Sequence, residues 1–121
     1  MTQPASQPIQ RFDQNHRRSR VVVHGDTLYF AGQCGDDLNA DAAQQTREAL
    51  ARIDKLLAEQ GSDRSRLLSV QLWITDLADF ETINEVYDAW VVPDHRPTRY
   101  CAVVGLAVPG AKVEVIPVAA R

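Results

Sequence analysis

The sequence lacks a long hydrophobic run, an excess of basic residues and a set of paired cysteines. No apolar stretch approaches the roughly 20 residues of a membrane-spanning helix, so we expect no membrane association. The chain carries 13 Lys and Arg against 16 Asp and Glu, a net charge of −3, which disfavours nucleic-acid binding. Two cysteines cannot form a disulfide framework, and the first ten residues show no signal-peptide pattern, so we expect a cytoplasmic protein.

What remains is the composition of one ordinary globular domain. Of the 121 residues, 45% are apolar and 24% are charged, which excludes disorder for most of the chain. Residues 1–15 are rich in Gln, Pro and Ser and show no hydrophobic periodicity, so we expect a mobile N-terminal tail there. The folded domain is expected to cover residues 16–121.

Hydrophobic periodicity predicts an α+β fold with the element order ββαβαββ. The expected helices cover residues 41–60 and about 79–91, and the expected strands cover 21–24, 27–31, 67–75, 98–106 and 112–119. The last two strands have apolar side chains on both faces, whereas a strand with one wet face alternates apolar and polar residues. Two helices can cover only one face of a small sheet, so we expect a second copy of the chain to cover the other.

Two charged residues interrupt these apolar strands. Arg99 begins one strand and Glu114 lies within the next, and the short turn between them predicts antiparallel neighbours. Charged residues are rarely buried unless they are paired or functional. Two interpretations stay open: a structural Arg99–Glu114 ion pair between subunits, or an anion site in which Arg99 binds a carboxylate and Glu114 is a general base.

Other reactive residues form no recognisable site. The three histidines have no metal-ligand spacing with one another or with the cysteines, so we expect no metal site. No histidine stands at a spacing that suggests activation of Cys101, and we interpret Cys34, in a loop, as incidental.

The run from Arg96 to Ala119, RPTRYCAVVGLAVPGAKVEVIPVA, resembles the C-terminal signature of the reactive intermediate deaminase family, also called RidA or YjgF. That signature contains Pro-x-Arg-x-Cys, a strand, a turn and a Val-Glu-Val segment. Residues 25–33 (GDTLYFAGQ) resemble another family motif, and both expected helices carry further matches. The blocks occur in the family's order over about residues 19–120.

The resemblance implies a chorismate-mutase-like fold, with one mixed sheet and two helices on one face, and a homotrimer with a pocket at each subunit interface. RidA-type members hydrolyse enamine and imine intermediates, such as 2-aminoacrylate and 2-iminobutanoate, to 2-keto acids and ammonia without a metal or organic cofactor. The expected partners are therefore a small carboxylate substrate and further copies of the chain, with no nucleic acid. The alternative is a non-catalytic trimer that binds small keto acids or similar carboxylates as a sensor or regulator.

The resemblance also implies roles for five residues. Arg99 holds the substrate carboxylate, the main chain of Cys101 contacts the substrate nitrogen, and Glu114 positions the attacking water. Asn84 lies near the pocket mouth, and Ala31 stands where the family has a serine at the pocket rim.

A further departure from the family pattern is Arg18, at about the position of a tyrosine near the pocket. This cation could favour a larger or dianionic substrate, or belong to a solvated arm, which is the interpretation we favour. The family also bears an older label, endoribonuclease. The acidic charge and the lack of a His/Lys/Arg cleavage cluster argue against that activity.

Overall fold

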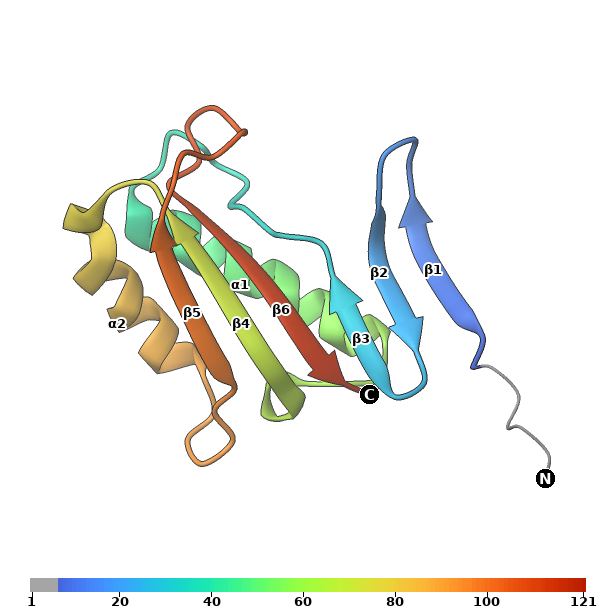
Figure 1. Cartoon of the computed structure of the whole chain (residues 1–121). Helices are drawn as coiled ribbons and strands as arrows, with labels where there is room; N and C mark the ends of the chain where they lie inside the picture. Colours follow the sequence, from blue (N-terminus) through green and yellow to red (C-terminus); the bar gives the residue numbers. More distant parts are fainter. Residues whose placement is uncertain (1–6) are drawn as a thin grey trace, which may run out of the picture.

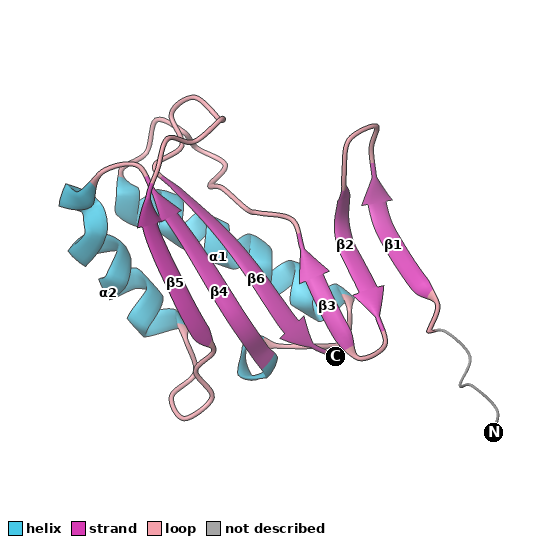
Figure 2. Ribbon diagram, viewed as in Figure 1, coloured by secondary structure: helices cyan, strands magenta, loops and turns pink. Residues whose placement is uncertain are grey.

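Two helices pack on one face of a six-stranded sheet and leave its other face uncovered (Figures 1 and 2). This computed structural model describes residues 7–121. The strands lie side by side in the order β1-β2-β3-β6-β4-β5. The elements are β1 (Ile9–Gln14), β2 (Ser19–His24), β3 (Thr27–Phe30), α1 (Ala42–Glu59), η1 (Arg64–Arg66), β4 (Leu67–Ile74), η2 (Leu77–Asp79), α2 (Phe80–Trp90), β5 (Thr98–Val103) and β6 (Val113–Ala120).

The long helix α1 forms where the sequence predicts it. Asp41 caps its first turn by accepting a hydrogen bond from the main-chain N–H of Gln44 at 2.9 Å. Gly61 follows the last turn at φ +72°, a left-handed conformation that glycine adopts without strain. The helix contributes Ile53 and Leu57 to the fully buried core. Within residues 7–121, no helix has both the length and the apolar character needed to cross a membrane.

The first strand, β1, is absent from the sequence-based prediction and corrects the domain boundary. Residues 1–15 are expected as a tail, yet Ile9–Gln14 pair with β2 in antiparallel register. All six residues of β1 are exposed, so this edge strand has no buried face to impose hydrophobic alternation. The folded unit therefore includes β1, while the first six residues of the expected tail lie outside the described part of the chain.

The strands that carry Arg99 and Glu114 are also not the neighbours that the sequence predicts. β5 pairs in parallel with β4, and β6 pairs antiparallel with both β4 and β3, so β4 separates β5 from β6. The prediction is wrong because β4, α2 and β5 form a β-α-β unit, in which the helix returns the chain for parallel pairing. The connection over residues 104–112 then crosses β4 to reach β6.

Strand register decides which side chains share a face. Val70 of β4 is fully buried against the helices and pairs with Arg99. Trp73, which points the other way, pairs with Glu114. Paired residues on neighbouring strands point to the same side of a sheet. Arg99 therefore lies on the helix-covered face, and Glu114 lies on the uncovered face.

The uncovered face is rich in apolar side chains, as the strand pattern predicts. Tyr29 and Tyr100 lie on it and remain 48% and 57% exposed. Ile116 and Val118 of β6 lie between them and are only half-buried. An apolar surface of this kind is typical of an interaction face.

Candidate functional site

Arg99 lies at the start of β5, where three side chains of α2 surround its guanidinium. Its Nη2 donates a hydrogen bond to the Asn84 amide oxygen. The guanidinium carbon lies 4.8 Å from the ring centre of Tyr87 and 5.9 Å from that of Phe80, within the range of cation–π attraction. The three α2 residues are spaced i, i+4, i+7 and so share one helix face. We call these four residues the arginine cluster.

Within the described chain, the positive charge of the arginine cluster has no counter-ion. The three ion pairs within residues 7–121 all join other residues, and no carboxylate pairs with Arg99. The side chain is half-buried, so water screens its charge only in part. The amide and the rings hold the guanidinium, while within the described chain its remaining N–H groups have no side-chain or main-chain acceptor. A held planar fork of this kind is suited to binding a carboxylate through two hydrogen bonds.

Glu114 lies against the segment that follows β3. Gln33 forms an antiparallel bridge with Val115 on the helix side, so Gly32 and Cys34 point to the side of Glu114. The Cys34 Sγ donates to Glu114 Oε1 at 3.9 Å. A Cβ at position 32 would stand 2.8 Å from Glu114 Cδ, so any other residue there would force the carboxyl group to move. We call Gly32, Cys34 and Glu114 the glutamate cluster.

The thiol of Cys34 is protonated at neutral pH. Burial raises the pKa of Cys34, the Glu114 carboxylate raises it further, and the Arg52 guanidinium lowers it by less. The thiolate is the nucleophilic form of cysteine. Cys34 therefore acts as a hydrogen-bond donor to Glu114 rather than as a nucleophile.

The arginine cluster and the glutamate cluster are separate within one chain. Arg99 pairs with Val70 and Glu114 pairs with Trp73, on opposite edges of β4. Three residues along the strand and two strand spacings put the α-carbons of Arg99 and Glu114 about 14 Å apart. Their side chains also point to opposite faces. An Arg99–Glu114 ion pair within one protomer is thereby excluded, and no single chain brings both groups to one small molecule.

The other site residues expected from the sequence, Asn84, Cys101 and Ala31, each lie in or beside one of the two clusters. Asn84 contacts Arg99 directly, and Cys101 follows two residues later on the same face of β5. Cys101 is exposed, and β5 is an outer strand with unpaired main-chain groups. Ala31 directly precedes Gly32; its N–H and C=O each form a hydrogen bond within the chain at 2.9 Å.

Four members of the clusters carry no site role in the sequence-based interpretation: Phe80, Tyr87, Gly32 and Cys34. The helical spacing of the two aromatic residues around Asn84 was a usable signal in the sequence. Gly32 and Cys34 alternate in an extended segment, but no sequence feature pairs that segment with β6.

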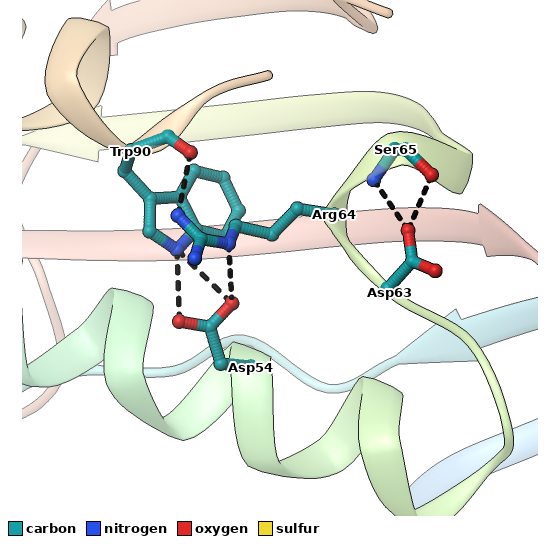
Figure 3. A network of polar contacts seen from close by, with 5 residues as sticks. All are labelled: Asp54, Asp63, Arg64, Ser65 and Trp90. Atoms are coloured by element: carbon teal, nitrogen blue, oxygen red, sulfur yellow. Dashed lines mark hydrogen bonds and ion pairs between the residues drawn. The ribbon is translucent and has the colours of Figure 1, made fainter.

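Three cavities in the part of the chain that the structure describes open elsewhere, and neither Arg99 nor Glu114 lines any of these three. The largest of the three, about 480 Å³, lies between α1 and α2. Figure 3 shows that three of its lining residues, Asp54, Arg64 and Trp90, bind one another. Arg64 Nε lies 3.1 Å from Asp54 Oδ1, and the Trp90 indole N–H donates to the same carboxylate at 3.2 Å. Arg64 also donates to the Trp90 carbonyl at 2.8 Å. This network ties the two helices to η1 and is structural.

Comparison with known proteins shows relatives along nearly the whole chain. Residues 8–121 match the family model described as Endoribonuclease L-PSP. The RutC family protein YoaB of Escherichia coli K12 is 44% identical over 112 residues, which cover 93% of this chain and 97% of YoaB. The 3-aminoacrylate deaminase RutC of Acinetobacter baylyi is 40% identical over 79 residues, which cover 65% of this chain and 62% of that protein.

Solved structures agree with this result. An uncharacterised protein from Pseudomonas aeruginosa superposes with a TM-score of 0.91 at 41% identity, covering 94% of this chain and 99% of that one. A YjgF-family protein from Neisseria meningitidis gives 0.92 at 32% identity, with coverages of 97% and 98%. The chain belongs to the Endoribonuclease L-PSP family, which is the RidA/YjgF family. The resemblance is confirmed, and so is the expected fold class of one mixed sheet with two helices on one face.

Proposed function

We propose that the chain is a hydrolytic deaminase that converts enamine and imine intermediates of the 2-aminoacrylate and 2-iminobutanoate class to 2-keto acids and ammonia. The observation that carries this proposal is the held guanidinium of Arg99, which has no counter-ion in the described chain. Such a group suits a small acid. Family membership adds support, because one relative is named 3-aminoacrylate deaminase.

The site is proposed to form between protomers of a homotrimer. Arg99 and Glu114 lie on opposite faces of the sheet, so one substrate can meet both only if they belong to different protomers. The apolar uncovered face provides the surface on which copies of the chain would associate. Asn84, Arg99 and Cys101 of one protomer then lie opposite Ala31 and Glu114 of the next.

The chemistry requires orientation more than activation, because an imine carbon is already electrophilic. Arg99 binds the substrate carboxylate and fixes the position of that carbon, while the main chain of Cys101 contacts the nitrogen. Glu114 accepts a proton from water as the water oxygen bonds to the carbon. For a protonated imine, Glu114 then returns this proton to the carbinolamine nitrogen, which leaves as ammonia, while the hydroxyl group loses its proton to solvent and becomes the carbonyl of the keto acid. No covalent nucleophile takes part.

An RNA substrate is not part of this proposal, although the family description contains the word endoribonuclease. The chain has a net charge of −3, and RNA binding depends strongly on positive charge along the phosphate path. Arg18 stands at about the position where the family has a tyrosine near the pocket. Its guanidinium donates a hydrogen bond to the main-chain carbonyl of Asp13.

A coupled assay tests the deaminase activity. A threonine dehydratase generates 2-iminobutanoate, and the release of 2-ketobutyrate is measured with and without the purified chain. We expect the chain to accelerate release and Arg99→Ala to abolish the acceleration. Arg47→Ala is the matched control, because Arg47 is exposed on α1 and forms no ion pair within residues 7–121. Equal rates of release with and without the chain would refute the deaminase function. Binding of a keto acid without turnover would favour the alternative, a non-catalytic sensor or regulator.

Arg99→Ala also distinguishes the two interpretations of Arg99, a substrate-binding residue or one half of a structural ion pair between subunits. If Arg99 only joins protomers, Arg99→Ala should dissociate the assembly. The proposal predicts instead that light scattering gives a mass of about three chains for both the wild type and the variant.

A further inference from the structure

The carboxylate of Glu114 is held on one side only. Its Oε1 accepts from the Cys34 thiol, and the same oxygen lies over the α-carbon of Gly32, where a Cβ would come within 3.0 Å of it. Within residues 7–121, Oε2 has no hydrogen-bond or ion-pair partner. The two oxygens of this carboxylate are therefore not equivalent.

The position of Cys34 is itself fixed. Its main-chain carbonyl accepts a hydrogen bond from Arg52 Nη1 at 3.3 Å, and Arg52 is paired with Asp36 at 2.5 Å. The bridge between Gln33 and Val115 aligns the segment with β6. The charged groups near the thiol are thus the Glu114 carboxylate on one side and the Arg52–Asp36 pair on the other.

We propose that Cys34 is a positioning residue for Glu114: its S–H group occupies Oε1 and leaves Oε2 to the attacking water. This inference rests on the proposed deaminase function for its catalytic meaning. It replaces the sequence-based interpretation of Cys34 as incidental with a proposed role. A thiol suits the task because burial and the adjacent carboxylate keep it protonated at neutral pH.

A labelling experiment tests the contact without any activity measurement. In a Cys101→Ser background, Cys34 is the single thiol, and its rate of alkylation by iodoacetamide reports the thiolate fraction as the pH rises. Glu114→Gln removes a neighbouring negative charge and should lower the midpoint by about 0.7 pH unit, the effect of a unit charge at about 4 Å in water. Asp26→Asn, in an exposed turn, is the control and should leave the midpoint unchanged. An equal midpoint in Glu114→Gln would overturn the proposal.

Two substitutions at position 34 then test the catalytic role. Cys34→Val fills the space without a donor, and Cys34→Ser keeps a donor in less space. We expect Cys34→Val to lower kcat about 3- to 10-fold with KM unchanged, because Arg99 of the neighbouring protomer still binds the substrate. Cys34→Ser should restore kcat. A merely structural role predicts no rescue by serine, and that result, or a wild-type kcat in Cys34→Val, would overturn the proposal.

The two proposals can fail separately. If the wild-type chain does not accelerate imine hydrolysis, the proposed deaminase function is refuted, and so is the catalytic role of Cys34 and Glu114. The alkylation midpoint still decides whether Cys34 and Glu114 are in contact, since it depends on charge and not on turnover.

Discussion

Replacing Gln45 by leucine tests what holds the loops on either side of the glutamate cluster. Gln45 is fully buried. Its Nε2 donates to the carbonyls of Ala40 at 3.0 Å and Gly110 at 3.1 Å, and its Oε1 accepts from the main-chain N–H of Lys112 at 2.8 Å. Leucine has a similar volume, but it removes these hydrogen bonds and leaves the three main-chain groups without their side-chain partner. The side chain therefore joins the loop before α1 to the loop before β6.

The magnitude follows from these three bonds, which are shorter than the fourth, from Nε2 to the Leu38 carbonyl at 3.4 Å. Each contributes about 1 kcal/mol net, so Gln45→Leu should lower the free energy of unfolding by about 3 kcal/mol. Gln44→Leu is the matched control, because within residues 7–121 the Gln44 side chain bonds only to Arg47 and Glu48 of its own helix. The stability lost in Gln44→Leu should stay below about 1 kcal/mol. Urea unfolding at one protein concentration measures both. Equal losses would refute the reasoning.

Three further predictions concern the clusters and the uncovered face. Gly32→Ala should lower kcat about tenfold with an unchanged circular dichroism spectrum, because the added Cβ displaces Glu114; an unchanged kcat would contradict the close approach. Ile116→Asp should convert the proposed trimer to smaller species in light scattering, because it places a charge on the uncovered face, whereas Ala89→Asp on the exposed side of α2 should not. A mass of three chains for Ile116→Asp would argue against that interface. The folded-state pKa of Cys34 is raised above its usual value of 9.0, so the unfolded chain loses the thiol proton first as the pH rises. Stability should therefore fall above about pH 9 in the wild type and less in Cys34→Ser; parallel stability curves would contradict the raised pKa.

Hydrophobic periodicity located the helices and most of the strands because each buries one stripe or one face. The prediction from periodicity failed where the pattern of buried residues is absent or irregular. β1 is exposed on both faces and so carries no pattern. Strict alternation also places Leu68 in the core with Val70, yet Leu68 is 48% exposed and Leu67 is buried. The register of β4 against β6 shifts between Leu67 and Ser69, and such a bulge moves a side chain to the other face without a signal in the apolar pattern.

In the candidate site, the sequence predicted what depends on local motifs and missed what depends on contacts between distant parts of the chain. Motif resemblance identified Arg99 and Asn84, and the structure brings them into contact. The expected adjacency of Arg99 and Glu114 failed because strand order depends on the path of the whole chain, which here inserts β4 between their strands. The contact of Cys34 with Glu114 joins residues 80 positions apart, so the local sequence around either residue could not indicate it.

Mixing two inactive variants tests the central claim most directly, namely that Arg99 and Glu114 act on one substrate from different protomers. Arg99→Ala and Glu114→Gln are each purified, unfolded together in equal amounts, refolded and assayed for imine hydrolysis. In a cyclic trimer formed at random, about a quarter of the interfaces combine an intact Arg99 with an intact Glu114. The account predicts about a quarter of the wild-type activity in the mixture and none in either variant refolded alone. A mixture as inactive as its components would contradict it.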